Sequence, residues 1–193
     1  MPCYVNHNNP EAAHVTCYNA FMKKNKKIKQ NRQKTNVMRI LDGAGIEYKA
    51  HDYTATGAIS GEEVAAALGQ NPSSTFKTLV TVGHSRLEGC QNVREYYVFV
   101  VPVDAELNLK KAAAAVGEKS IEMIKQKELL PLTGYVHGGC SPIGMKKPFT
   151  TTIDSSAARF DTIMFSAGRI GQQVELSLAD LEKVLDFKLA DIK

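Results

Sequence analysis

The sequence predicts a single α+β domain built around one curved or barrel-like mixed β-sheet with flanking helices. Segments with strand-like patterns outnumber helical ones, and the two types do not alternate strictly, as they would in a doubly wound parallel sheet. With 193 residues, of which 44% are apolar, the chain can bury one sizeable core without disulfides. No apolar run approaches the roughly 20 residues that cross a bilayer, so we expect no membrane partner.

The first elements are expected to be a helix, a strand and a second helix. Thr35 or Asn36 can cap the first helix, which should end at the glycines near position 44. Residues 46–53 alternate as a strand would. Ser60 and Glu63 form a capping box for the second helix. The apolar stripe of the first helix comprises Val37, Ile40, Leu41 and Ala44.

Two strands are expected next, at 75–83 and 95–104. In the first, Phe76, Thr78 and Val80 should share one face, and Lys77 should lie with Leu79 and Thr81 on the other. The second is apolar on both faces, which is typical of a central strand.

The rest of the chain should alternate irregularly between helices and strands. A helix at 109–116 and a short strand at 120–123 precede a segment that is helical at best as far as Leu130, because Pro131 follows. After a glycine-rich loop at 134–148 we expect a strand at 149–154. Two further strands joined by a turn at Gly168–Gly171 then lead to a last helix capped by Ser177 and Asp180, with Leu178, Leu181, Val184 and Leu185 along it.

The first 34 residues are expected to be a leader and a flexible basic arm, and residues 35–193 one folded domain. Residues 22–35 hold seven basic residues and no acid, whereas residues 36–193 hold 17 basic and 19 acidic residues. The folded part is therefore no basic nucleic-acid platform, while the arm is either solvated or in contact with a polyanion. The four scattered cysteines indicate reduced thiols in a cytoplasmic protein, and the histidines have no metal-ligand spacing.

Three features could carry chemistry: Lys77 within its strand, the loop 138–144 (GGCSPIG) and the turn 166–171 (SAGRIG). A strand lysine either extends along the sheet edge to reach water or has a binding or catalytic task. Glycine loops let backbone N–H groups approach an anion, but neither loop has the spacing of a nucleotide-phosphate motif. Cys140 is interpreted as a small packing residue rather than a nucleophile.

Four ordered motifs resemble the YbaK family, the relatives of the editing domain inserted in bacterial prolyl-tRNA synthetases. They are NPSSTFKTLV, VPVDAELNLKKAAAAVG, LTGYVHGGCSPIGMKK and FSAGRIGQQVELSLADL, within about Thr35 to Ile192. The resemblance implies a trans-acting deacylase that removes cysteine from Cys-tRNA(Pro) without a cofactor or a metal. Its implied partners are mischarged tRNA and, as a further candidate, prolyl-tRNA synthetase.

The resemblance also guides the choice of site residues. The candidate catalytic residues are Lys77, Tyr53, Gly138 and Gly139, and the candidate substrate-binding residues are Ser166, Thr78, Ser141, Gly168 and Gln173. Gln173 stands where the family has an acidic side chain, which leaves a carboxylate role there without support.

The expected mechanism uses the substrate's own thiol, which attacks the ester carbonyl and forms a thiolactone that water opens. Lys77 would project into a glycine-walled cleft and hold the terminal phosphate or ribose, while N–H groups of Gly138 and Gly139 bind the oxyanion. Tyr53 and Ser166 would fix the amino group and the ribose. Two alternatives remain: an Ala-tRNA(Pro) deacylase that uses water, and a module that binds tRNA or a synthetase without turnover.

Overall fold

The computed structural model describes residues 34–58, 60–84 and 94–193, so the predicted leader and nearly all of the basic arm lie outside it. From Thr35 onward the described residues form one compact unit. Its helices are α2 (Asn36–Gly43), α3 (Gly61–Ala67), α4 (Leu109–Val116), α5 (Gln126–Thr133) and α6 (Leu178–Leu181), with short 3₁₀ turns at Pro72–Ser74 and Ser155–Arg159. Its strands are β1 (Lys49–Asp52), β2 (Phe76–His84), β3 (Arg94–Pro102), β4 (Ile121–Met123), β5 (Thr150–Asp154), β6 (Ile163–Arg169), β7 (Gln172–Leu176) and β8 (Phe187–Ala190).

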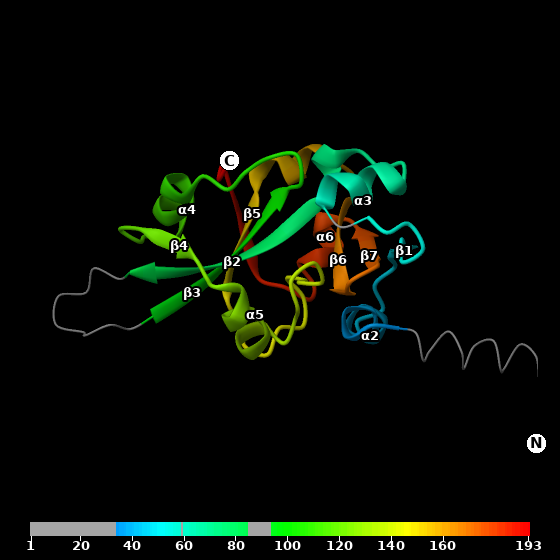
Figure 1. Ribbon diagram of the computed structural model, residues 1–193, viewed down its shortest axis with the longest axis horizontal. Coiled ribbons are helices and arrows are strands. Elements are labelled where there is room, and N and C mark those ends of the chain that lie inside the picture. The colour runs from blue at the N-terminus through cyan, green and yellow to red at the C-terminus, as the bar shows by residue number, and fades with distance from the viewer. Residues whose placement is uncertain (1–33, 59, 85–93) are drawn as a thin grey trace, which may run out of the picture. The chain divides into compact units, whose positions relative to one another are not determined.

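The strands form two sheets, which corrects the prediction of one barrel-like sheet (Figure 1). The larger sheet has the order β4-β2-β3-β5-β8, and the smaller has the order β1-β7-β6. The two sheets meet at an isolated parallel bridge between Thr75 and Met164, so neither closes into a barrel. The prediction of a mixed α+β domain is confirmed, because antiparallel and parallel pairs both occur in the larger sheet.

Strand β2 links the two sheets. It pairs antiparallel with β3 along its whole length, but with β4 only from Thr81 to Gly83. The bridge from β6 is made to Thr75, the residue immediately before β2. Beyond the bridge β2 and β6 diverge, which leaves a wedge between the two sheets.

The helix starts follow the predicted capping residues. The Thr35 hydroxyl accepts a hydrogen bond from the Met38 N–H at 3.3 Å, and Ser60 and Glu63 make both bonds of the capping box. Asn108 caps α4 through two backbone N–H groups. These caps fix where α2, α3 and α4 begin, as the sequence predicted.

Helix α5 continues through Pro131 to Thr133, where the sequence predicted an end at Leu130. The helix is short, so the proline removes one donor near its C-terminal end, and other bonds hold the last turn. The Thr133 hydroxyl donates to the Leu129 carbonyl at 2.7 Å, and Gly134 ends the helix in a left-handed conformation.

The C-terminal segment also differs from the prediction. Helix α6 ends at Leu181 instead of continuing to Leu185, and a strand that was not predicted, β8, follows it. Strand β8 pairs in parallel with β5, so its partner lies more than 30 residues earlier in the chain. No helix in the described ranges is long and apolar enough to cross a membrane.

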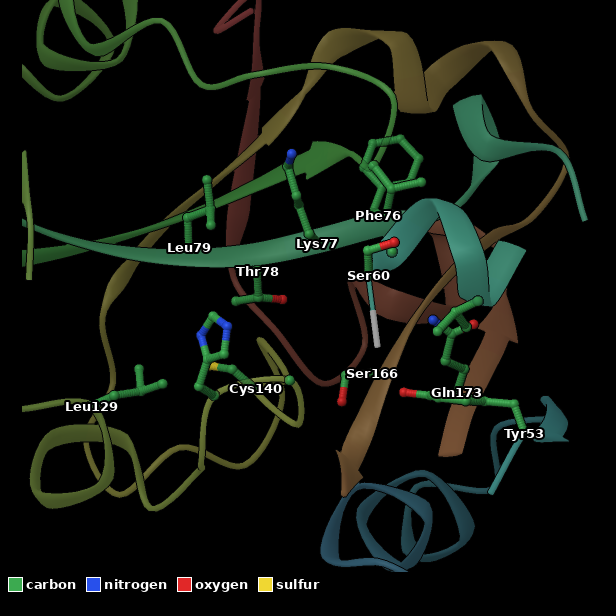
Figure 2. Close-up of a pocket in the computed structure, with 15 residues that line it drawn as sticks. Tyr53, Ser60, Phe76, Lys77, Thr78, Leu79, Leu129, Cys140, Ser166 and Gln173 are labelled. Atoms are coloured by element: carbon green, nitrogen blue, oxygen red, sulfur yellow. The ribbon is translucent and has the colours of Figure 1, made fainter. Parts of the chain in front are cut away.

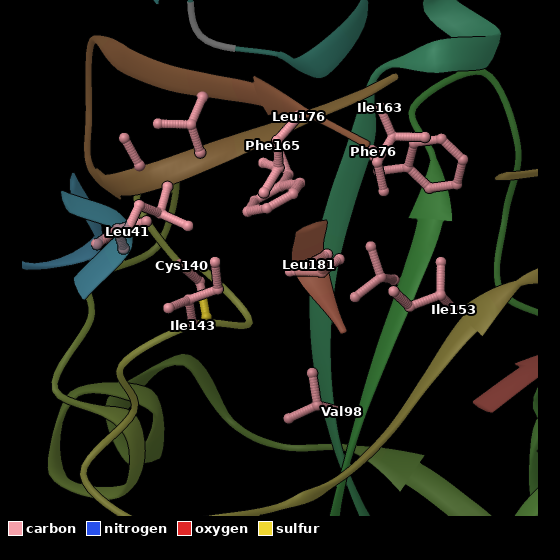
Figure 3. Close-up of a cluster of buried hydrophobic side chains, with 14 of the residues drawn as sticks. Leu41, Phe76, Val98, Cys140, Ile143, Ile153, Ile163, Phe165, Leu176 and Leu181 are labelled. Carbon is pink, nitrogen blue, oxygen red and sulfur yellow. The ribbon is translucent and has the colours of Figure 1, made fainter. Parts of the chain in front are cut away.

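The main core lies against the smaller sheet and the even-numbered face of β2 (Figure 3). Phe76, Val80 and Phe165 pack there with Leu41 of α2. A second cluster, which includes Phe99 and the alanines of α4, covers the opposite face, where Leu79 packs against it. The two faces of β2 are therefore covered by different groups of residues.

Candidate active site

A cavity of about 240 Å³ occupies the wedge between the two sheets (Figure 2). The α3 start, strand β2, helix α5, the glycine loop and the smaller sheet all contribute to its wall. Its lining residues are Tyr53, Ser60, Gly61, Val64, Phe76, Lys77, Thr78, Leu79, Val103, Leu129, His137, Gly138, Cys140, Ser166 and Gln173. Six of the predicted site residues are among them: Lys77, Tyr53, Gly138, Ser166, Thr78 and Gln173.

The cavity follows the edge of β2 rather than one of its faces. Thr78 leaves β2 on one face, while Lys77 and Leu79 leave it on the other, and all three residues line the cavity (Figure 2). A cavity that is bounded by both faces of one strand must open along that strand's edge.

Lys77 lines the cavity, but its ammonium does not lie on the face of Thr78. The Nζ of Lys77 lies 3.0 Å from Oε1 of Glu106. The lysine side chain is 28% exposed and the glutamate side chain 92% exposed. The structure thus differs from the expectation that this amine projects into the cleft, because strand alternation sends it to the outer face.

The two glycines of the loop have different structural tasks. Gly138 has φ +80° within a turn that is closed by a 3.0 Å bond from the Gly139 N–H to the Val136 carbonyl. Glycine is favoured at such a position because it lacks the Cβ that restricts other residues. Since the turn uses the Gly139 N–H, the N–H of Gly138 is the better candidate donor to a ligand.

Gly139 does not line the cavity but holds the loop close to the β6–β7 turn. A Cβ added to Gly139 would lie 3.1 Å from the backbone nitrogen of Ile170 and 3.3 Å from the carbonyl carbon of Arg169. The glycine therefore allows two backbone segments to touch.

Ser141 and Gly168 also lie outside the cavity lining. The Ser141 side chain is fully buried, and its hydroxyl accepts from the Ile143 N–H at 3.3 Å. Gly168 has φ +85° and packs against Tyr135, while its N–H donates to the Ser166 hydroxyl at 3.3 Å. Both residues are thus engaged in shaping the loop and the bulged end of β6.

The smaller sheet presents Tyr53, Ser166 and Gln173 to the cavity. Ser166 of β6 and Gln173 of β7 are cross-strand neighbours, and Tyr53 follows β1, which is the other neighbour of β7. The Tyr53 N–H donates to the Gly171 carbonyl at 2.8 Å, which ties the end of β1 to the β6–β7 turn. Tyr53 is 7% exposed and Gln173 is 6% exposed, so both are buried residues of the cavity wall.

Two buried oxygens in the cavity wall have no hydrogen-bond partner among the described residues: Oγ1 of Thr78 and Oε1 of Gln173. Buried polar atoms are nearly always paired in folded proteins, since an unpaired one costs roughly 1–3 kcal/mol. Both atoms are thus buried polar groups in the cavity wall that the described residues leave without a partner.

Cys140 lines the cavity but is poorly suited to attack an ester. Burial raises the pKa of its thiol to about 12, although a hydrogen bond with Thr133 lowers it somewhat. At neutral pH the thiol stays protonated, and the thiolate is the nucleophilic form. The structure thus agrees with the interpretation of Cys140 as a packing residue.

Sequence reasoning did not assign the other lining residues to the site. His137 could have been suspected from its place beside the two glycines, although it has no metal-ligand spacing. The apolar residues that line the cavity carry no chemical signal in the sequence, and only the fold brings them together: Val64, Phe76, Leu79, Val103 and Leu129.

Comparison with known proteins places this chain in a family. Residues 56–184 match the model of the aminoacyl-tRNA editing domain. A protein of Enterococcus faecalis that carries the name Cys-tRNA(Pro)/Cys-tRNA(Cys) deacylase EbsC is 40% identical over 165 residues, which is 85% of this chain and 96% of that protein. The chain belongs to the aminoacyl-tRNA editing domain family, which confirms the resemblance found in its motifs.

Solved structures share the fold at lower identity. A protein named as a trans-editing enzyme for prolyl-tRNA synthetase superposes with a TM-score of 0.68 at 23% identity, and covers 82% of this chain and 98% of its own. The hypothetical protein APE2540 gives a TM-score of 0.69 at 22% identity, with 82% of this chain and 99% of its own covered. These matches show that the chain shares its overall fold with both solved structures.

Proposed function

We propose that this protein is a trans-acting deacylase that removes cysteine from mischarged Cys-tRNA(Pro). The observation that carries the proposal is a small cavity with neutral polar groups and a glycine loop but no activated nucleophile of its own. Family membership and the name of the 40% identical relative support the same reaction. The cavity is smaller than the roughly 300–1,000 Å³ of drug-sized sites, so it suits one amino acid rather than a large ligand.

The cavity wall favours catalysis by the substrate's own thiol. No carboxylate lies among the described residues that line the cavity, so His137 has no acid there to complete a triad with Ser60 or Ser166. Cys140 is held as a neutral thiol. The sulfur of the bound cysteinyl ester supplies the missing nucleophile, because a free thiol is partly ionised near neutral pH.

In the proposed reaction the cysteinyl sulfur attacks its own ester carbonyl carbon. The carbon–oxygen bond to the terminal ribose breaks, and the ribose oxygen takes up a proton. The resulting thiolactone is strained, and water opens it to free cysteine. The Gly138 N–H stabilises the developing oxyanion, while Tyr53 and Ser166 position the substrate.

Lys77 binds a phosphate of the tRNA acceptor end at the outer mouth of the cavity. Its ammonium is paired with the highly exposed carboxylate of Glu106, and surface ion pairs of this kind are worth only about 0–1 kcal/mol. A tRNA phosphate can therefore replace Glu106 at small cost. In this proposal the reacting ester lies in the cavity, and the negatively charged chain of nucleotides leaves it past Lys77.

The test is a panel of mischarged tRNAs, Cys-tRNA(Pro), Ala-tRNA(Pro) and correctly charged Pro-tRNA(Pro), incubated with the wild type and with Lys77→Ala. We expect rapid loss of cysteine alone, and a fall of at least 100-fold in kcat/KM for the Lys77 variant at unchanged thermal stability. Faster release of alanine would instead identify a water-dependent alanyl deacylase. Binding of Cys-tRNA without release of any amino acid would identify a binding module and refute the proposal.

A further inference from the structure

The edge of β2 has one unpaired position, at Thr78. The Val103 N–H donates to the Thr75 carbonyl at 2.8 Å, so odd-numbered residues of this strand direct their backbone groups toward β3. The Ile124 N–H donates to the Val80 carbonyl at 3.3 Å on the opposite edge. Because backbone groups alternate along a strand, the N–H and C=O of Thr78 point to the same edge as those of Val80.

On that edge the neighbouring strands leave a gap. Strand β4 pairs with residues 81–83, and the one bridge from β6 is made to Thr75, the residue before the strand. Within the ranges that the structure describes, no strand pairs with β2 at Thr78 on this side. The gap opens on the cavity, since Lys77, Thr78 and Leu79 all line it.

Two unpartnered side-chain oxygens belong to residues that line this cavity. One is Oγ1 of Thr78, the gap residue itself, and the other is Oε1 of Gln173 in the smaller sheet. A glutamine Oε1 only accepts hydrogen bonds, so its missing partner must be a donor. The cavity thus offers a backbone donor and a backbone acceptor at the gap, and a side-chain acceptor in the wall formed by the smaller sheet.

An aminoacyl ester has the complementary pattern. Its α-amino group donates and its carbonyl oxygen accepts, with the spacing of one residue of a peptide strand. We propose that the aminoacyl group binds as one added strand residue at the edge of β2. Its carbonyl oxygen accepts from the Thr78 N–H, and its amino group donates to the Thr78 carbonyl and to Oε1 of Gln173.

This inference rests on the proposed function and names the groups that read the substrate. It assigns to Thr78 a backbone role, which a side-chain comparison would not detect. It also makes Gln173 a neutral acceptor for the amino group, in a cavity where no carboxylate among the described lining residues could hold an ammonium.

The first test combines a variant with a substrate analogue. Wild type and Gln173→Leu are assayed on Cys-tRNA and on 3-mercaptopropionyl-tRNA, which keeps the thiol but lacks the amino group. We expect each single change to lower kcat/KM about 10- to 100-fold. The two changes together should cost little more than either alone, because they remove the same hydrogen bond.

Gln172→Leu is the matched control. Gln172 also has a buried Oε1 without a partner in the described part of the chain, but it is the preceding residue of β7 and does not line the cavity. This control should keep kcat/KM on Cys-tRNA within about twofold of wild type. Equal losses in the two glutamine variants, or losses that multiply in the double change, would overturn the role of Gln173.

The second test removes the backbone donor. Incorporating the α-hydroxy acid analogue of threonine at position 78 replaces its N–H by an ester oxygen, and because it also weakens the Lys77 carbonyl as an acceptor toward β3, urea unfolding of the same protein is measured beside its activity. We expect a fall of about 100-fold in kcat with little change in KM, as for the loss of an oxyanion donor. Full activity of this protein would overturn the strand-edge model while leaving the deacylase function in place. A wild type that is inert on Cys-tRNA would refute the function itself.

Discussion

The ammonium of Lys77 lies 3.0 Å from the carboxylate of Glu106, on the face of β2 opposite to Thr78. In the proposed binding mode, the strand would separate the lysine ammonium from the reacting ester. This arrangement fits an anchor for the nucleotide end of the substrate better than a group that touches the carbonyl carbon.

Replacing Glu106 by glutamine should strengthen the binding of tRNA. The carboxylate competes with phosphate for Lys77, and a pair of this exposure contributes up to about 1 kcal/mol, so KM should fall about two- to fivefold with kcat unchanged. Steady-state deacylation of Cys-tRNA at low and high salt measures this, and the gain should shrink as salt screens the charges. Glu182→Gln removes an equal charge from an exposed position outside the cavity; an equal gain there would show a net-charge effect only.

Cys140→Ser should remain an active deacylase. Burial holds the pKa of this thiol at about 12, so the protein loses no nucleophile in the variant. Burying a hydroxyl in place of the thiol should cost about 1 kcal/mol of folding free energy. We expect kcat/KM on Cys-tRNA within about threefold of wild type, together with a slightly lower midpoint of urea unfolding. A folded but inactive variant would contradict a reaction driven by the substrate's thiol.

Gly168→Ala should lower the free energy of unfolding rather than raise the KM for the substrate alone. The residue has φ +85°, and an added Cβ would lie 2.8 Å from Cε1 of Tyr135 and 3.1 Å from Cγ2 of Val37. The strained backbone and the clash should together cost about 2–4 kcal/mol in urea unfolding. Gly43→Ala, at the open end of α2, should instead stabilise the protein by up to about 1 kcal/mol. Unchanged stability with a raised KM would restore Gly168 to the substrate site.

Asp154→Asn should destabilise the protein at neutral pH. Burial raises the pKa of this carboxyl, but hydrogen bonds from Ser156 and the Ile192 N–H and the charge of Lys193 outweigh it and hold the pKa below its usual value. The stabilisation that the ionised Asp154 provides is therefore complete above the pKa of about 4 that this carboxyl has in the unfolded chain. It is lost as the pH falls through the lower pKa of the folded state. Urea unfolding should give a difference of about 2 kcal/mol at pH 7 that shrinks below pH 4, whereas a difference independent of pH would contradict the charge effect.

Local signals predicted most of the fold, and non-local pairing caused the errors. Ser60 with Glu63 and Asn108 began the helices where expected, because a cap depends on residues within one turn. Strand β8 was missed, since four residues show little alternation and its partner β5 is distant in the chain. The barrel-like sheet was predicted because a sequence does not show that β2 and β6 meet only at one bridge.

The sequence predicted several residues of the candidate site, but not where their side chains and backbone N–H groups point. The period of β2 correctly separated Lys77 from Thr78, yet nothing in the sequence indicated which face, or which edge, would border a cavity. The glycine pair was expected to provide two equivalent donors, whereas a turn uses the N–H of Gly139. Such a difference depends on the exact path of the loop, which residue composition does not determine.

The close approach of Gly139 to the backbone at Ile170 has a consequence for engineering this cavity. The loop at Gly139 and the β6–β7 turn at Ile170 are about 30 residues apart in the chain, and their backbones touch with no side chain between them. Little ordering should then be needed when a ligand arrives, and less of its affinity is lost to immobilising loops. A graft of the glycine loop onto another scaffold must bring the hairpin with it as one rigid piece.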